Sequence, residues 1–313
     1  MGSGHWSTDV YEAARAFRDA IGADAFAYTA SGAATTHPAL DPFGVAVRES
    51  RDSAEHPESL AIAVLFDVTG SMGTVPRVLQ AKLPSLLGLL LRKGYVEHPQ
   101  IMFGAVGDAT CDRAPLQIGQ FESDNRMDDD LARILLEGGG GGQMMESYEL
   151  AMYFMARHTA LDCLEKRGRR GYLFMIGDEL AYPRVDRRLV AKVIGDELAE
   201  DIPIERIVAE LRRKYEVFFI IPEDGYHAAD PRLRDFWRRL LGQNVLFLDD
   251  LGAVSETIAL TIGLSERAID LAEGLEHLSE VGSEAGGSVS RALAPLDVRP
   301  VVRHGRGGHT RLR

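Results

Sequence analysis

The sequence predicts an α/β fold in which helices flank an open, mostly parallel, doubly wound sheet. The clearest evidence is residues 60–66, LAIAVLF, in which no polar residue alternates with the apolar ones. Such an unbroken run is typical of a strand buried on both faces, as the strands of a parallel sheet are. Similar runs recur along the chain with amphipathic patterns between them, which is the alternation expected of repeated strand–helix units.

The expected elements follow from these runs in chain order. An amphipathic helix over residues 8–21 comes first, with Val10, Ala14, Phe17 and Ile21 on one stripe. The expected strands are residues 60–66, 101–108, 115–121, 172–178, 217–222 and 245–250. The expected later helices are residues 76–92, 128–137, 145–161, 186–196, 203–214, 230–241 and 254–271.

Three regions differ in composition. Residues 1–57 are expected to form a helical and irregular N-terminal extension, and its aromatic residues favour packing on the core. Residues 58–272 carry the α/β pattern. From residue 273 the pattern lapses, and the chain ends in RPVVRHGRGGHTRLR, so 273–313 is expected to be a flexible C-terminal tail.

Composition limits the classes of function. The chain has 313 residues and a formal net charge of −12, and an acidic surface repels nucleic acid. Only the Arg/Gly/His-rich end is an exception, as a candidate for binding RNA or an acidic partner. Two distant cysteines make no disulfide framework, and we see neither a signal peptide nor a spanning helix. A cytoplasmic protein without membrane partners is expected.

Oxygen-bearing side chains follow the first predicted strand directly. Asp67, Thr69 and Ser71 stand at every second position after it, and carboxylate and hydroxyl oxygens suit Mg²⁺, or alternatively Mn²⁺ or Ca²⁺. Asp108 and Asp178 also end predicted strands, and the carboxyl ends of parallel strands share one sheet edge. The sequence therefore predicts a metal site at this edge.

Residues 58–265 resemble the von Willebrand factor A (VWA) domain family, in its intracellular bacterial type with a metal-ion-dependent adhesion site. The Asp-x-Thr-x-Ser motif of Asp67, Thr69 and Ser71 matches the family's first metal loop, and Asp178 matches its third. The family's second loop normally provides a Thr after glycines, but this chain has EGGGGGQMMESYELAMY. The candidates there are Gln143, Glu146 and Ser147, and we favour Glu146 and Ser147.

Several features of these loops have alternative interpretations. Glu146 as a ligand would make the site neutral or anionic, but it also suits the start of a helix. Asp108 and Asp112 suggest a second cation, whereas the acids at 128–130 are expected mainly to stabilise a helix start. The basic run 166–170 is either a docking surface or a solvated loop.

The resemblance implies a Mg²⁺-dependent protein-interaction module and no catalysis. It suggests a partner such as a MoxR-type AAA+ ATPase or another subunit of a stress or conflict assembly. One alternative is a Mg²⁺-dependent hydrolase or phosphatase with Asp67 as nucleophile, although such phosphatases carry Asp-x-Asp where this chain has Thr69. Another is a structural assembly subunit whose metal site is vestigial.

Overall fold

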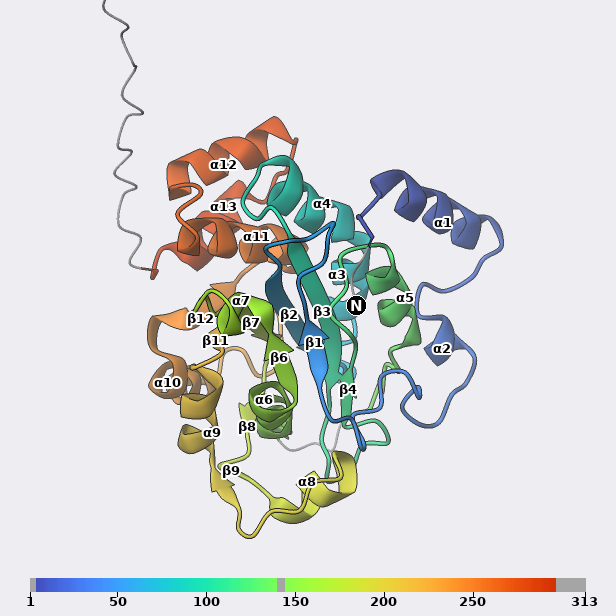
Figure 1. The fold of residues 1–313 in the computed structure, drawn as a ribbon, viewed down its shortest axis with the longest axis vertical. Helices are drawn as coiled ribbons and strands as arrows, with labels where there is room; N and C mark the ends of the chain where they lie inside the picture. Colours follow the sequence, from blue (N-terminus) through green and yellow to red (C-terminus); the bar gives the residue numbers. More distant parts are fainter. Residues whose placement is uncertain (1–3, 140–143, 297–313) are drawn as a thin grey trace, which may run out of the picture.

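A six-stranded sheet forms the centre of the computed structural model (Figure 1). The structure describes residues 4–139 and 144–296, without the side chain of Ser71. In spatial order the strands are β12 (Val245–Leu248), β11 (Tyr215–Pro222), β7 (Gly171–Ile176), β2 (Leu60–Asp67), β3 (Pro99–Val106) and β4 (Leu116–Ile118). Neighbouring strands are parallel except β3 and β4. The predicted α/β class with a mostly parallel sheet is confirmed.

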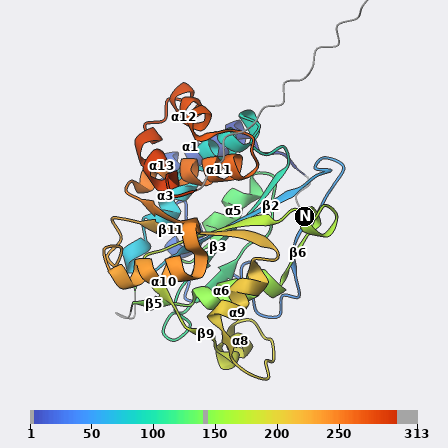
Figure 2. The ribbon, with the colours of Figure 1, turned by 90° about the vertical axis from the view of Figure 1, so that its left-hand side faces the viewer.

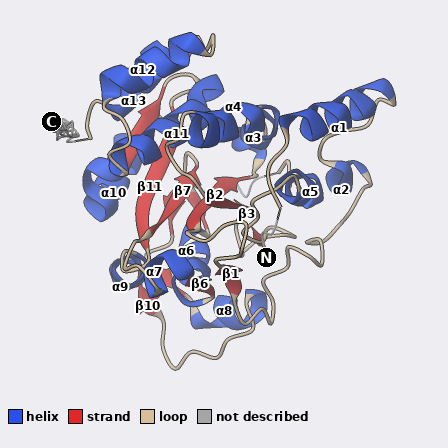
Figure 3. Ribbon diagram, turned by 45° about the horizontal axis from the view of Figure 1, so that its top comes forward, coloured by secondary structure: helices blue, strands red, loops and turns tan. Residues whose placement is uncertain are grey.

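Helices cover both faces of this sheet, which explains why its strands carry unbroken apolar runs. Figures 2 and 3 show α6 (Tyr148–Arg157) and α9 (Ile204–Leu211) on one face, and α4 (Leu83–Leu87) and α11 (Val254–Ser265) on the other. Every residue of β2 and β3 is buried. At about 25 cal/mol per Å² of apolar surface, this burial is the main stabilising contribution.

The remaining elements are further helices, helical turns and small strands. The helices and helical turns are α1 (Thr8–Ala20), α2 (Ala27–Ala30), η1 (Gly70–Met72), α3 (Val75–Ala81), η2 (Gly88–Arg92), α5 (Arg126–Arg133), α7 (Asp162–Glu165), α8 (Arg187–Val193), α10 (Pro231–Leu241), η3 (Gly242–Asn244) and η4 (Leu251–Ala253). The small strands are β1 (Arg48–Ser50), β5 (Met145–Glu146), β6 (Thr159–Leu161), β8 (Leu180–Ala181), β9 (Arg184–Val185) and β10 (Ile202–Pro203).

Two expected helices are interrupted. The helix expected over 76–92 is divided into α3, α4 and η2, and Pro84 lies in the first turn of α4, where its missing N–H breaks no helical hydrogen bond. The helix expected over 145–161 is only α6, because β5 and β6 flank it. These flanking strands make contacts with distant segments that local periodicity does not show.

The N-terminal extension packs on the domain in part. β1 pairs in parallel with β6, and Tyr11 and Phe26 are buried in the common core. The apolar stripe of α1 behaves differently, because Val10 and Phe17 are 55% and 65% exposed. The predicted helix is thus present, but its apolar stripe faces solvent.

The flexible tail expected from residue 273 is wrong for the part up to residue 293. Leu271–Glu280 form α12 and Gly286–Leu293 form α13, and both pack against α11. Their buried side chains, such as Leu278 and Val289, cover an α11 that is buried almost all round. Residues 297–313, with the basic end, lie outside the described structure. Among the described helices, none is long and apolar enough to cross a membrane.

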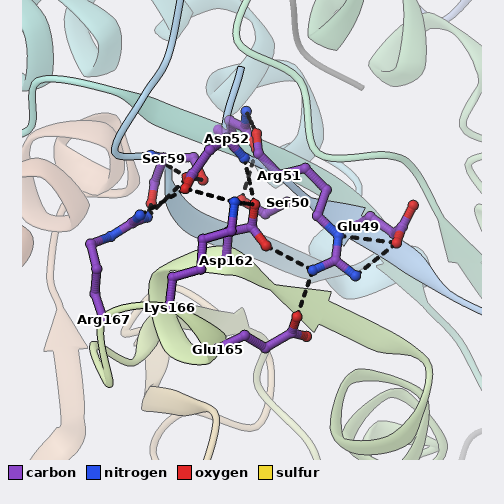
Figure 4. Close-up of polar contacts among 10 residues, drawn as sticks. Glu49, Ser50, Arg51, Asp52, Ser59, Asp162, Glu165, Lys166 and Arg167 are labelled. Atoms are coloured by element: carbon purple, nitrogen blue, oxygen red, sulfur yellow. Dashed lines mark hydrogen bonds and ion pairs between the residues drawn. The ribbon is translucent and has the colours of Figure 1, made fainter. Parts of the chain in front are cut away.

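The basic run 166–170 is used inside the molecule, at the amino-terminal edge of the sheet. Arg167 binds both carboxylate oxygens of Asp52, at 2.8 and 3.0 Å (Figure 4). Lys166 pairs with Asp162 at 2.7 Å, and Arg51 reaches the same carboxylate at 2.8 Å. Arg169 and Arg170 pair with glutamates of other elements. These contacts attach the segment before β2 to α7 and the loop before β7.

We expect Asp52→Asn to lower the free energy of unfolding at pH 7 by about 1–3 kcal/mol, because it leaves Arg167 without a charged acceptor. The guanidinium of Arg167 is the largest influence that holds the pKa of Asp52 well below its usual range. The stabilisation is therefore complete above the unfolded-state pKa of about 4 and is lost as the pH falls below it.

Urea unfolding at pH 7, 5 and 3 measures this difference. Asp24→Asn is the control, because Asp24 pairs with Arg77 nearer the surface, and we expect less than about 1 kcal/mol there. Equal stability of Asp52→Asn and wild type at pH 7 would show that the network contributes nothing.

Candidate functional site

The carboxyl ends of the parallel strands hold the candidate site. β3 lies on one side of β2 and β7 on the other, so the chain reverses its winding direction between β2 and β7. Loops that leave such strands diverge, and the crevice between them is where ligands bind in open α/β sheets. Asp67 is the last residue of β2, and Asp178 follows β7 by two residues. The structure thus brings both carboxylates to this crevice.

Asp67 is fully buried and accepts hydrogen bonds on both carboxylate oxygens. Its Oδ1 accepts from the backbone N of Thr69 at 2.7 Å and from Thr69 Oγ1 at 2.6 Å. Its Oδ2 accepts from the Tyr148 hydroxyl at 3.2 Å. The backbone continues into η1, while the side chain of Ser71 lies outside what the structure describes. Two residues of the motif are therefore adjacent, and Tyr148 is a neighbour that the motif did not include.

The glycine-rich second loop approaches the first loop through the backbone. The N–H of Gly70 donates to the carbonyl of Gly139 at 2.6 Å. Residues 140–143, and with them the candidate Gln143, lie outside the described structure. The loop then continues into β5, which pairs in parallel with β8 from the loop after β7. Backbone hydrogen bonds therefore connect the second loop to the loop after β2 and to the loop after β7.

The two favoured second-loop residues occupy different environments. The hydroxyl of Ser147 accepts from the backbone N of Ala109 at 2.9 Å, which ties it to the loop after β3. Glu146 is 3% exposed, and its Oε2 is buried without a hydrogen-bond partner among the described residues. Of the two, only Glu146 has a side-chain oxygen without a hydrogen-bond partner among the described residues.

Asp178 is supported by a fourth loop, which follows β11. Its Oδ2 accepts from the backbone N of His227 at 3.1 Å. A side chain at Gly225 could not be accommodated here, because a Cβ there would lie 2.7 Å from the Cβ of Asp178. The missing side chain of Gly225 is therefore what lets this loop close over Asp178.

The acids proposed for a second cation hold their own loop together. Asp108 accepts from the backbone N and hydroxyl of Thr110 at 2.9 and 2.8 Å, and from the Tyr182 hydroxyl at 3.1 Å. Asp112 accepts from the backbone N of Asp108 at 2.6 Å. Across the described residues, no group of three or more His, Cys, Asp or Glu side chains has an arrangement that could hold a metal ion. This geometry therefore supports neither the second cation nor a preformed three-carboxylate site at Asp67, Glu146 and Asp178.

Two residues near Asp67 and Asp178 were not among the predicted site residues. Glu179 directly follows Asp178, is 6% exposed, and has its Oε2 buried without a hydrogen-bond partner in the described part of the chain. Tyr148 opens α6, and its ring packs edge-on against Phe219 and Trp237. For Glu179, the signal in the sequence was a second acid after a buried strand. For Tyr148 there was none.

Burial and mutual repulsion raise the pKa values of several acids at this edge. Loss of solvation is the largest influence, and it raises the pKa of Glu179 to about 8. It also raises the pKa values of Glu146 and Asp67 above their usual range. Nearby carboxylates add to the shift, because a neighbouring negative charge disfavours ionisation. Such an accumulation of acids is electrostatically suited to a cation.

Comparisons with known proteins add little to this geometry. No family model matches the sequence, and no curated protein matches it. Among solved structures, the chain is similar to the pilus adhesin SpaC from Lactobacillus rhamnosus GG, with 8% identity and a TM-score of 0.47 over 70% of this chain and 31% of the adhesin. It is also similar to the vWF domain of the type V pili tip protein Mfa5 from Porphyromonas gingivalis, with 13% identity and a TM-score of 0.42 over 66% and 96%. Since these TM-scores are below 0.5, the fold assignment depends on the strand order instead.

We expect Gly177→Ala to destabilise the protein and to displace Tyr148 from Asp67. A Cβ at Gly177 would lie 1.8 Å from the Tyr148 hydroxyl oxygen and 2.8 Å from the ring carbon that carries it. Such overpacking costs about 1–3 kcal/mol, occasionally more. Urea unfolding measures the loss.

Gly139→Ala is the matched control, since a Cβ there meets no described atom within 4 Å. If both substitutions change stability equally, the close approach of Tyr148 to the end of β7 is not what makes Gly177 necessary.

Proposed function

We propose that this chain is a divalent-cation-dependent protein-interaction domain of the VWA type, with its site at the carboxyl ends of β2 and β7. The observation that carries the proposal is the pair of acids at that crevice, Asp67 and Asp178. Beside them lies Glu146, whose Oε2 has no hydrogen-bond partner in the part of the chain that the structure describes. Thr69 adds a hydroxyl next to Asp67. The donors are all hard oxygens, which suit Mg²⁺, Mn²⁺ or Ca²⁺.

The oxygen donors present are of the kind that suits such an ion, although in the described residues they are not grouped as a formed metal site. An isolated buried carboxylate is costly, and a cation compensates that cost directly. When bound, the ion would supply a Lewis-acidic position for an oxygen of the partner protein. The chain's own residues would position it: Thr69 and Tyr148 orient the Asp67 carboxylate, and the loop of His227 orients Asp178.

Our proposal for the partner is based on the family resemblance alone. A MoxR-type AAA+ ATPase or another subunit of a cytoplasmic assembly is the first candidate. Asp67 as the nucleophile of a hydrolase is the competing proposal, and Tyr148 and Thr69 occupy both of its oxygens with hydrogen bonds. A vestigial site in an assembly subunit is the third, and the same experiments separate all three.

We expect the purified chain to bind about one Mn²⁺ ion saturably, displaced by Mg²⁺, when followed by EPR or water-proton relaxation. Asp67→Ala, Asp67→Asn and Asp178→Ala should abolish binding, because each removes a carboxylate of the crevice. Asp24→Ala is the control, since Asp24 lies outside the crevice, where it pairs with Arg77 and accepts from the backbone N of Phe26. Circular dichroism establishes that each variant is folded.

Pull-downs from cell extract then test the partner. We expect the wild type to recover proteins that are lost with EDTA and with Asp67→Asn. Recovery of the same proteins in all three cases would contradict the interaction proposal. Mg²⁺-dependent turnover of a phosphate ester that disappears in Asp67→Asn would support the hydrolase instead.

A further inference from the structure

A large cavity lies between the N-terminal extension, the loop after β3 and helix α8. Its volume is about 830 Å³, and residues within 35–48, 112–116 and 192–193 line it. Small-molecule pockets in proteins typically measure about 300–1,000 Å³, so the cavity is large enough for such a ligand. Neither Asp67 nor Asp178 belongs to its lining, so it is separate from the crevice between β2 and β7.

Backbone hydrogen bonds hold the extension against the domain on two sides of this cavity. The N–H of Gly44 donates to the carbonyl of Ile194, just after α8, at 2.8 Å. The N–H of Ile118, in β4, donates to the carbonyl of Leu40 at 2.8 Å. The cavity is therefore built from segments that are far apart in the sequence but bonded to one another, which makes it a defined feature of the fold.

Arg48 is a half-buried cation in the wall of the cavity. Its Nη2 donates to the carbonyls of Ala39 and Ile118, at 2.9 and 3.1 Å. Burial lowers its pKa, and Asp130 opposes this shift from a distance, since the carboxylate of Asp130 is paired with Arg133 at 2.9 Å. The positive charge of Arg48 is thus held by neutral carbonyl groups.

Two other arginines in a similar situation do have acidic partners. Arg18, Arg48 and Arg167 each have a buried side-chain nitrogen without a hydrogen-bond partner in the described part of the chain. Arg18 pairs with Asp128 at 2.9 Å, and Arg167 pairs with Asp52 at 2.8 Å. Because a charge that leaves water is costly unless an opposite charge compensates it, Arg48 is the one of these three that would gain most from an added anion.

Four further charged residues line the cavity. Both acids accept a hydrogen bond from a backbone N–H of their own loop, at 2.9 Å for Asp41 and 2.6 Å for Asp112. Arg113 pairs with Glu137 at 3.2 Å. Lys192, in the last turn of α8, forms no ion pair within the described ranges. Lys192 is therefore a second cation of the wall without an acidic partner.

Much of the remaining wall is apolar. Val45, Leu116 and Val193 contribute aliphatic side chains, and Phe43 contributes an aromatic ring that is 60% exposed. Ligand pockets commonly combine such an apolar lining with a few polar groups that orient the ligand. A ligand that matches this wall therefore has one anionic group and an apolar body.

We propose that this cavity binds a small organic carboxylate, with its anionic group at Arg48 and Lys192 and its apolar body against Phe43, Val45 and Leu116. The inference goes beyond the proposed function, because it requires neither the acids of the crevice nor a bound cation. A monocarboxylate suits the wall better than a phosphate ester, since the second negative charge of a phosphate would be repelled by the two aspartates of the lining.

Methyl NMR of the full-length purified chain, titrated with sodium phenylacetate, tests the inference. We expect saturable shifts of the methyl groups of Val45, Leu116 and Val193, which line the cavity. Phenylacetamide has the same shape without the charge, and we expect it to bind at least about tenfold more weakly, because hydrogen bonds to a charged group are the stronger ones. Phenyl phosphate should also bind more weakly than phenylacetate.

Substitutions then identify the cations. Arg48→Gln should weaken phenylacetate binding by about tenfold, and Lys192→Gln by about threefold, since the lysine is exposed. Arg188→Gln is the matched control, because Arg188 is an exposed cation of the same helix that does not line the cavity. Circular dichroism establishes that each variant is folded, and Lys192→Gln provides the test if the loss of the carbonyl contacts of Arg48 unfolds the other.

Three results would overturn the inference: no saturable shift with phenylacetate, equal affinity for phenylacetate and phenylacetamide, or wild-type affinity in the folded variants of Arg48 and Lys192. The Asp67→Asn variant separates the inference from the proposed function. We expect it to lose Mn²⁺ binding and to bind phenylacetate as the wild type does. Loss of phenylacetate binding in folded Asp67→Asn would contradict a separate carboxylate site.

Discussion

The burial of several carboxylates at one edge of the sheet is the constraint on which the rest of this structure depends. Each acid that leaves water loses solvation, and each acid beside another adds repulsion. The fold accommodates Asp67 because Thr69 and Tyr148 supply hydrogen-bond donors to both of its oxygens. Within the described part of the chain, Glu146 and Glu179 each lack a donor for one oxygen. The unfavourable electrostatics of this edge are thus only partly compensated by the protein itself.

Backbone pairing holds these acids at fixed positions, because repulsion alone would separate them. Gly70 bonds to the glycine-rich segment, and β5 bonds to β8, so the loops after β2 and β7 are both tied to the second loop. A side chain at Gly177 would collide with Tyr148, and one at Gly225 would collide with Asp178. The site is therefore determined by the loop backbones as much as by the acids.

What the sequence could predict depends on how far each signal reaches along the chain. Asp67 and Asp178 were predictable because each follows a long apolar run whose end is visible locally. The pairing of Glu146 with Ala181 depends on β5 and β8, two-residue strands without any periodicity of their own. The helices over 271–293 were missed because their short amphipathic patterns gain stability only from packing against α11. Local patterns therefore identified the strand ends but not the long-range contacts between loops.

The two edges of the sheet both carry buried acids, but the charges beside these acids differ. At the amino-terminal edge, Asp52 and Asp162 are paired with Arg51, Lys166 and Arg167, so these charges stabilise the fold (Figure 4). At the carboxyl edge the strongest neighbours of Glu146 are acids. Buried acids that lack cationic partners are costly to keep, and functional sites are where proteins commonly retain such costly groups. What distinguishes the two edges is therefore the set of basic residues that pair with the acids at the amino-terminal edge.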